Sequence, residues 1–486
     1  MKHCVNLLAN TVIVASVFVW GTGCKEKKVL ERPNILWIMA DDLGTDLACY
    51  GTPEIQTPNL DRLATEGTRY TNMFTVAAVS SVSRSAMITG MYPVSINCHQ
   101  HRTQYKSPLP DSIKPITEYF RNTGYYVSNG TVKDRTKFGK TDYNFAHSVE
   151  ELYDGPDWAG RKEGQPFFAQ IQISYPHRPF IHDTVHPINP NKVLIPPFYP
   201  DHPVTRKDWA LYLETIQVVD RQVGLILDRL EKEGLLENTV VFFFGDQGQP
   251  HVRAKQFMYE EGTHTPLIVR WPGKLKPNTV CNDLISNVDL SAQVLAIAGI
   301  ALPSYMHGKE FINDAPKREY LFSMRDRRDE TVDRIRAVRS TRYRYIRNFC
   351  PDLPYTQPNL YKKFNYPVLT LMRLMHCERT LSKEQDIFMS DIRPVEELYD
   401  LVKDPFELNN LAADSGSVAI KNKMSSTLDD WLQKYDVAVY PEDEREVEYA
   451  KILMKTNFEK WMQQKGLDPS ISDENFLKWW YHKLSL

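Results

Sequence analysis

The sequence predicts an α/β fold in which a large, mostly parallel sheet is flanked by helices and followed by a smaller C-terminal α+β subdomain. Short apolar runs alternate with helical patterns up to about residue 315, which is typical of a mainly parallel sheet. Beyond that point, strand-like segments are followed by two amphipathic helices. We therefore predict an α/β domain over residues 30–315 and an α+β subdomain with a helical tail over residues 316–486.

The strand predictions rest on apolar runs bounded by polar residues. Residues 34–40 form one such run, which stops abruptly at Asp41 and Asp42. A continuous apolar run indicates a strand buried on both faces, and ligands of open α/β sheets collect at the carboxyl ends of such strands. Four further runs have the same character: residues 125–127, 167–173, 240–244 and 266–270.

Helical periodicity separates these runs and also marks the C-terminal part. In the predicted α/β domain, the helical segments are residues 59–66, 83–89, 116–122 and 207–233. In the subdomain we expect a small sheet from residues 336–339, 343–347 and 397–400. Helices are expected over residues 418–434 and 444–466.

The overall charge excludes one class of partner. The 486 residues include 59 basic and 61 acidic side chains, giving a formal net charge of -2. A chain balanced in this way has no global field that would attract a nucleic acid or a membrane surface. We therefore expect no nucleic-acid partner.

The N-terminus has the pattern of an export signal over residues 1–24. Lys2 precedes an apolar stretch at residues 7–20, which is shorter than the roughly 20 residues of a spanning helix. Small residues then lead to Cys24, in a pattern that resembles the lipobox of a bacterial lipoprotein. We expect an exported protein, periplasmic or attached to the outer membrane only through a lipid on Cys24. The alternative is a plain signal peptide with an incidental cysteine.

Two polar pairs at strand ends suggest a metal site. Asp41 and Asp42 end one predicted strand, and Asp246 and Gln247 end another. Their carboxylate and amide oxygens are hard ligands, which suit Ca²⁺ or Mg²⁺ better than zinc. Each pair alone is more often a turn or a helix cap. Two such pairs at strand ends favour a metal.

The segment from Ser80 to Arg84 begins a predicted helix that ends at Gly90. The first turn of a helix offers free N–H groups and the positive end of the dipole to an anion. Arg84 adds a planar set of donors that suits a tetrahedral oxyanion. Considered alone, the segment also fits a capping serine followed by a surface arginine.

Several distinctive segments follow one another along the chain. They are residues 32–36 and 40–42, residues 57–61, residues 80–90, residues 259–262 with 266–273, and residues 397–411. By these segments in this order, rather than by any one of them, the chain from about Arg32 to Ala412 resembles the type I sulfatases of the alkaline phosphatase superfamily, whose maturation motif and its helix match residues 80–90.

The resemblance implies an alkaline-phosphatase-like fold and a sulfuric ester hydrolase that removes sulfate from a sulfated sugar of a glycan. In this family a maturase oxidises residue 80 to formylglycine (3-oxoalanine), here from Ser80. Its hydrate attacks sulfur with one hydroxyl, and the other then expels sulfate by C–O cleavage. Val82 stands where the family usually has proline or alanine.

The resemblance also assigns roles to individual residues. Residue 80 would bind Ca²⁺ together with Asp41, Asp42, Asp246 and Gln247, the last of which replaces the more common asparagine. Arg84 would be a catalytic residue beside it. Lys255 matches the lysine that holds the sulfate, and His177 the histidine that protonates the leaving alcohol. Lys140 matches the family's Gly-Lys motif, and Lys133 is a rival for that role.

Two further segments are candidates for substrate contacts. His99, His101 and Arg102 follow the maturation helix. Arg327 and Glu330, in the charged segment at residues 325–330, would reach the sugar from the second domain. For both segments a solvated surface role is the alternative.

Two other functions remain open at this stage. Phosphodiesterases and phosphonate hydrolases of the superfamily use a similar site, although Lys140, Lys255, His177 and Arg84 around one metal favour a sulfate monoanion. A catalytically silent glycan-binding lipoprotein is the other, if Val82 prevents maturation.

Overall fold

The computed structural model describes residues 32–312 and 316–486. The predicted export signal, including Cys24, lies outside these ranges. From Pro33 to Leu486 the chain forms one compact unit, and the domain boundary at residue 315 stays a prediction. Of the helices described, none combines the length and the apolar character needed to cross a membrane.

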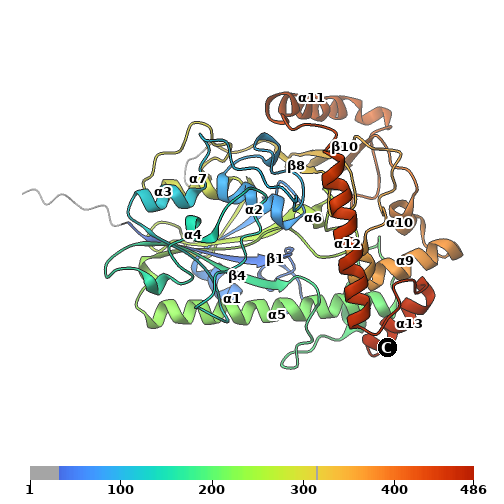
Figure 1. Cartoon of the computed structure of the whole chain (residues 1–486), viewed down its shortest axis with the longest axis horizontal. Coiled ribbons are helices and arrows are strands. Elements are labelled where there is room, and N and C mark those ends of the chain that lie inside the picture. Colours follow the sequence, from blue (N-terminus) through green and yellow to red (C-terminus); the bar gives the residue numbers. More distant parts are fainter. Residues whose placement is uncertain (1–31, 313–315) are drawn as a thin grey trace, which may run out of the picture. The chain divides into compact units, whose positions relative to one another are not determined.

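A seven-stranded sheet forms the centre of the structure (Figure 1). From one edge to the other, its strands are β3 (Tyr126–Thr131), β4 (Phe167–Pro176), β1 (Asn34–Asp41), β5 (Thr239–Gly245), β6 (His264–Arg270), β2 (Thr68–Phe74) and β7 (Thr279–Ser286). Only β6 among them runs antiparallel to its neighbours. The predicted mostly parallel sheet is therefore confirmed.

Helices cover both faces of this sheet (Figure 1). On one face lie α1 (Pro58–Glu66) and the long α5 (Pro203–Lys232). On the other lie α2 (Ser80–Thr89), α3 (Ile116–Asn122) and α7 (Asp289–Ile297). Two short helices, α4 (Val149–Leu152) and α6 (Glu260–Thr263), lie in connections between strands.

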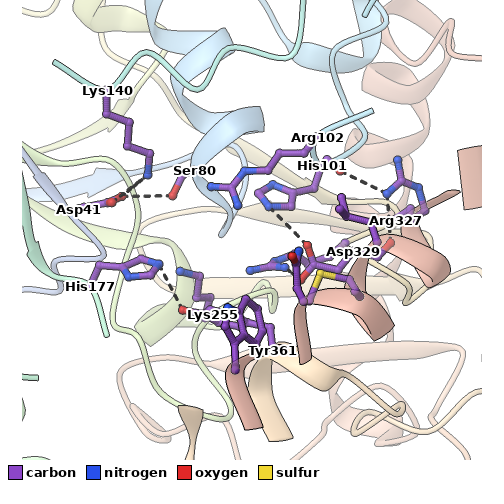
Figure 2. Close-up of a pocket in the computed structure, with 16 residues that line it drawn as sticks. Asp41, Ser80, His101, Arg102, Lys140, His177, Lys255, Arg327, Asp329 and Tyr361 are labelled. Carbon is purple, nitrogen blue, oxygen red and sulfur yellow. Dashed lines mark hydrogen bonds and ion pairs between the residues drawn. The ribbon is translucent and has the colours of Figure 1, made fainter. Parts of the chain in front are cut away.

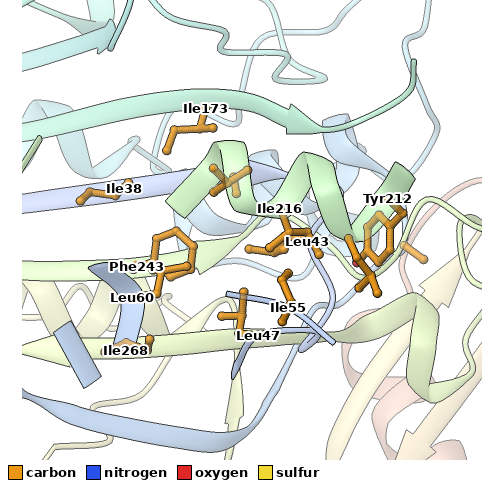
Figure 3. Packing of buried hydrophobic residues seen from close by; sticks show 14 of the residues in the cluster. Ile38, Leu43, Leu47, Ile55, Leu60, Ile173, Tyr212, Ile216, Phe243 and Ile268 are labelled. Atoms are coloured by element: carbon orange, nitrogen blue, oxygen red, sulfur yellow. The ribbon is translucent and has the colours of Figure 1, made fainter. Parts of the chain in front are cut away.

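Strand β1 is buried on both faces, which explains why its sequence is apolar from Ile35 to Ala40. Ile38 points to the face covered by α1 and α5, where it belongs to one cluster with Leu60, Ile216 and Phe243 (Figure 3). Its neighbour Trp37 points to the opposite face and belongs to the second cluster. Because successive side chains alternate between two buried faces, the strand has no solvent side.

A four-stranded antiparallel sheet forms the smaller part, as the predicted α+β subdomain requires. Its order is β11 (Glu396–Asp400), β10 (Tyr343–Asn348), β9 (Ile335–Arg339) and β8 (Leu321–Arg325). The helices of this part are α8 (Leu360–Asn365), α9 (Pro367–Glu378), α10 (Lys383–Asp386), α11 (Val418–Tyr435), α12 (Glu444–Gln464) and α13 (Asp473–Lys483). Helix α11 packs on β9 and β10.

Buried charged contacts tie the smaller sheet to the larger one. Arg344 of β10 donates to Glu260 at 3.0 Å, and Tyr259 donates to Glu397 of β11 at 2.8 Å. The loop between β8 and β9 reaches the carboxyl edge of the large sheet, where the main chain of His101 donates to the carbonyl of Arg327 at 3.0 Å. The C-terminal part therefore supplies side chains to this edge.

Candidate active site

The carboxyl ends of β1 and β5 bring three carboxylates together. Asp41 ends β1, Asp42 follows it, and Asp246 follows β5. One oxygen of each lies within 4.8 Å of the others, and all three residues are buried. The pairing of β1 with β4 shifts its register between Ala40 and Asp41, which is where the strand must turn its side chains toward this group.

The amide of Gln247 completes a set of oxygen donors. Its nitrogen donates to Asp42, while its Oε1 is buried without a hydrogen-bond partner among the described residues. Asp42 has a φ of 64°, an uncommon backbone conformation for a residue other than glycine. Three carboxylates and an unpartnered amide oxygen are the donors that a hard divalent cation requires, so the residues fit Ca²⁺.

The electrostatic surroundings of Asp41 and Asp246 differ. Asp41 pairs with Lys140 at 2.8 Å and with Arg84 at 3.5 Å. Burial favours the neutral acid, but these cations hold the pKa of Asp41 well below its usual value. Burial, together with the neighbouring Asp41, raises the pKa of Asp246. A bound cation would favour the ionised form of Asp246 as well.

Ser80 is the first residue of α2 and is held beside the carboxylates. Its Oγ donates to Asp41 at 3.2 Å, and the residue is 3% exposed. All ten residues of α2 are buried. Asn287 fixes the helix from α7's side by donating to the Ser83 hydroxyl at 2.9 Å. The helix ends at Gly90, whose φ of 66° favours glycine. Ser80 therefore occupies a rigid helix start.

Lys255, His177 and Tyr361 form a second group beside Asp42. Lys255 Nζ lies 2.5 Å from Asp42, and His177 Nε2 lies 3.9 Å from the same carboxylate. His177 Nδ1 donates to the carbonyl of Arg178 at 2.6 Å, so Nε2 is the nitrogen that faces the site, where it lies 3.2 Å from the Tyr361 hydroxyl. Burial and then Lys255 lower the pKa of His177.

These groups open into a cavity of about 290 Å³ (Figure 2). Ser80, Asp41, Lys140, His177 and Lys255 line its inner end. The remaining lining residues are His101, Arg102, Arg327, Arg328, Asp329 and Tyr361, together with Ala450, Leu453, Met454, Asn457 and Trp461 of α12. The cavity thus has a charged inner end and a wall that comes from the C-terminal part.

The other predicted residues lie around this cavity in different ways. Asp42, Asp246 and Gln247 are buried beneath it. Arg84 lines a smaller adjoining cavity and donates to Asp246 at 2.8 Å. It therefore holds the carboxylates and does not line the larger cavity. Lys133 lies 3.3 Å from the Tyr175 hydroxyl, whereas its rival Lys140 contacts Asp41.

Two of the substrate candidates do not line the cavity. The ring of His99 packs against Tyr440 with centroids 5.6 Å apart. Glu330 accepts a hydrogen bond from the main chain of Leu360 at 2.5 Å, which stabilises the start of α8. Arg328 and Asp329 lie in the predicted segment 325–330, although the prediction singled out Arg327 and Glu330 within it. Sequence reasoning missed Tyr361 and the α12 residues, for which no local motif gave a signal.

Comparisons with known proteins show the family of the chain. The family model described as Sulfatase matches residues 33–300, and that of the N-sulphoglucosamine sulphohydrolase C-terminal region matches residues 248–353. An ulvan-active sulfatase of Formosa agariphila is 34% identical, over 87% of this chain and 79% of the relative. The N-sulphoglucosamine sulphohydrolase of Homo sapiens is 26% identical, over 82% and 90% of the two chains.

Solved structures show the same fold at lower identity. A 2-O GAG sulfatase has a TM-score of 0.61 at 20% identity, covering 86% of this chain and 96% of its own. The phosphonate monoester hydrolase of Agrobacterium radiobacter has a TM-score of 0.59 at 17% identity, with coverage of 83% and 96%. The fold alone therefore does not separate sulfate esters from phosphonate esters.

Proposed function

The chain belongs to the sulfatase family of sulfuric ester hydrolases, and we propose that it removes sulfate from a sulfated sugar unit of a glycan, using formylglycine made from Ser80 and Ca²⁺. The observation that carries the proposal is the position of Ser80. It starts α2, touches Asp41 and lines one cavity with Lys140, His177 and Lys255. The relatives act, by their names, on sulfated carbohydrates.

The metal would be held by Asp41, Asp42, Asp246 and Gln247 with residue 80. When bound, Ca²⁺ would neutralise these carboxylates and draw charge from a sulfate oxygen. Lys140 and Lys255, each paired with one of the carboxylates, would add positive charge on two sides of the sulfate. Arg84 would hold Asp41 and Asp246 in place through its own ion pairs.

Formylglycine would supply the nucleophile, and His177, in its imidazolium form, would supply a proton from Nε2. Its Nδ1 is occupied by the carbonyl of Arg178, so that only Nε2 can exchange a proton with the leaving sugar oxygen. The Tyr361 hydroxyl fixes the ring from the other side. Protonation is needed because an alkoxide is a poor leaving group.

The proposals on the maturation of Ser80 and on the location of the protein rest on the sequence alone. We propose that a formylglycine-generating maturase modifies Ser80 in the segment that includes Val82. We also propose that the protein is exported, either to the periplasm or to the outer membrane through a lipid on Cys24. Metabolic labelling with a radioactive fatty acid tests the lipid, since a Cys24→Ser variant should take up none.

The substrate class is tested by measuring sulfate release from a panel of defined sulfated monosaccharides, with a phosphonate monoester as the rival substrate. We expect kcat/KM for at least one sugar sulfate to exceed that for the phosphonate by a wide margin. A preference for the phosphonate would replace the proposal by the phosphonate hydrolase alternative, whose fold is shared.

Calcium removal gives a prediction that does not depend on turnover. Chelation should lower the melting temperature, and Ca²⁺ at 100 times its Kd should stabilise the protein by about 2.7 kcal/mol. Gln247→Leu should weaken Ca²⁺ binding by about 10-fold or more, because it removes the unpartnered oxygen. Calorimetric titration measures both effects.

The matched control is Gln249→Leu, two residues along. Gln249 donates to Asp46 at 2.8 Å and is not part of the carboxylate group. Its loss should leave the Ca²⁺ affinity unchanged. Equal affinities for the native protein and the Gln247→Leu variant would remove Gln247 from the metal site.

A further inference from the structure

The cavity has a second polar wall that the sulfate chemistry does not use. It is formed by His101, Arg328 and Asp329, which we call the outer wall. All three line the cavity, and each is less than one-tenth exposed. His101 and Asp329 lie on one side of the site, away from Lys140 and His177 (Figure 2).

The outer wall contains buried polar atoms without hydrogen-bond partners among the described residues. They are His101 Nε2 and Arg328 Nε. Arg328 Nη1 and Asp329 Oδ2 contact each other as an ion pair. His101 Nε2 lies 3.8 Å from Asp329 Oδ1, beyond hydrogen-bond distance. Leaving such atoms unpaired costs stability, so a ligand is expected to supply their partners.

The neighbouring Arg327, in the same loop, has a structural role. Its guanidinium donates to Glu442 at 2.6 and 3.0 Å, and to the carbonyls of His101 and Asp329 at 3.2 and 3.0 Å. It thereby fixes the outer wall and the segment before α12. Arg327 therefore supports the loop through its hydrogen bonds. Arg328 keeps an unpaired donor, Nε, and is the arginine that can bind a ligand.

The mixture of donors and acceptors identifies the group that fits. Arg328 can only donate, and the carboxylate of Asp329 can only accept. An acidic group on the substrate would suit Arg328 but would be repelled by Asp329. The other arginine of the cavity, Arg102, is paired with Asp142 at 2.8 Å and adds little free positive charge. Hydroxyl groups both donate and accept, so they satisfy both residues.

Helix α12 supplies an apolar wall for the ring that carries those hydroxyls. Ala450, Leu453, Met454 and Trp461 line the cavity at the spacing of one helical face, together with the polar Asn457. Leu453 is 38% exposed and is therefore accessible to a ligand in the cavity. Trp461 is held by Phe364, with ring centroids 5.4 Å apart. Neither matched family model extends to α12.

We propose that the outer wall binds a pair of neighbouring hydroxyl groups on the sulfated sugar, while the apolar face of α12 packs against its ring. This rests on the proposed function, because it places the sugar next to a sulfate held at Ser80. It assigns Arg328 and Asp329 as specificity-determining residues. The substrate class is a sulfated monosaccharide unit with an unsubstituted vicinal diol.

Tyr361 links the two ends of the cavity. Lys255 Nζ lies 5.4 Å and the Arg328 guanidinium 4.9 Å from the centroid of its ring. The sulfate-holding lysine and the outer wall are therefore separated by little more than one aromatic ring. A single sugar unit can reach both, with its sulfate at one end and its diol at the other.

The test is the substitution Asp329→Asn, made in the full protein carrying formylglycine. Asp329 has a φ of 50°, and asparagine tolerates that conformation best among the residues of this size, so the loop should keep its shape. We expect the ratio of kcat/KM for the sugar sulfate to that for 4-nitrophenyl sulfate to fall about 10- to 100-fold. The aryl sulfate has no hydroxyl for the wall to bind.

A panel of monodeoxy sugar sulfates identifies the hydroxyl group that Asp329 binds. Removing the hydroxyl that Asp329 binds should cost the native enzyme about as much as the substitution does. The same deletion should then cost the Asp329→Asn variant little more, because the two changes remove one interaction. The control is Asp157→Asn, which breaks a pair with Arg229 outside the cavity and should leave the ratio unchanged.

Three results would overturn the inference. One is an equal loss on both substrates in Asp329→Asn, which would indicate a role in the fold or in the chemistry. Another is that, for every deoxy sugar, the loss caused by removing the hydroxyl adds fully to the loss caused by Asp329→Asn. The third is a gain by Asp329→Asn on sugars with a carboxylate or a second sulfate, which would make the wall an anion subsite. If the native enzyme hydrolyses aryl sulfate but no sugar sulfate carrying a diol, this inference fails alone; if it hydrolyses no sulfate ester, the proposed function fails as well.

Discussion

Replacing Ser80 with alanine is expected to abolish sulfate ester hydrolysis, with a loss in kcat of at least about 10⁴-fold. Alanine cannot be oxidised to formylglycine, so the variant has no nucleophile at the start of α2. The fold should be unaffected, because the position is a small side chain whose hydroxyl makes one contact, to Asp41. Sulfate release and the melting temperature measure the two effects.

Two further variants make the result interpretable. Ser80→Cys should retain activity if the maturase of the host accepts both residues. Ser85→Ala, in the same buried helix, loses hydrogen bonds to Ser81 and Asn144 but should keep turnover. Full activity in Ser80→Ala would refute the assignment of residue 80.

The second large effect should separate His177 from Lys255. His177→Ala should reduce hydrolysis of a sugar sulfate by about 10²- to 10⁴-fold, the usual contribution of general acid catalysis. It should reduce hydrolysis of an aryl sulfate far less, because a phenolate leaves without a proton. Lys255→Ala should reduce both by similar factors, since its charge acts on the sulfate itself. Values of kcat/KM for both variants on both esters decide the matter.

A nearby histidine provides the control for this comparison. His182 pairs with Glu214, outside the cavity, and is half exposed. His182→Ala should leave the ratio between the two esters unchanged. An equal loss on aryl and sugar sulfates in His177→Ala would remove the acid role and leave His177 as a sulfate ligand.

The large sheet could be predicted where its strands are buried on both faces. The interior residues of β1 (35–40) and β5 (240–244) are all apolar, and both strands were recognisable for that reason. Strands β2 and β7 were missed. Residues of β2 alternate irregularly between buried and partly buried, and the first half of β7 is partly exposed. The reversed direction of β6 depends on its pairing partners, which its own sequence does not record.

The residues of the site fall into the same two groups: those that a local sequence pattern reveals and those that only long-range packing brings to the cavity. Asp41, Asp246 and Ser80 lie at ends of elements that local patterns reveal, and the sequence predicted each of them. Asp329 lies in the charged segment 325–330, which was predicted to reach the sugar. Tyr361 and the α12 residues reach the cavity only because the C-terminal part packs against the larger sheet. No local pattern contains that long-range packing. For His99 and His101, two residues apart, the sequence could not tell which one faces the cavity.

The most direct test of the account is the mass of the tryptic peptide that spans residues 70–84 and contains Ser80. The protein should be produced together with a maturase that accepts serine and shown to hydrolyse a sugar sulfate. The account predicts that this peptide is lighter than its sequence requires by two hydrogen atoms, the loss that converts serine to formylglycine. An unmodified Ser80 in protein that hydrolyses the sugar sulfate at the full rate would contradict it.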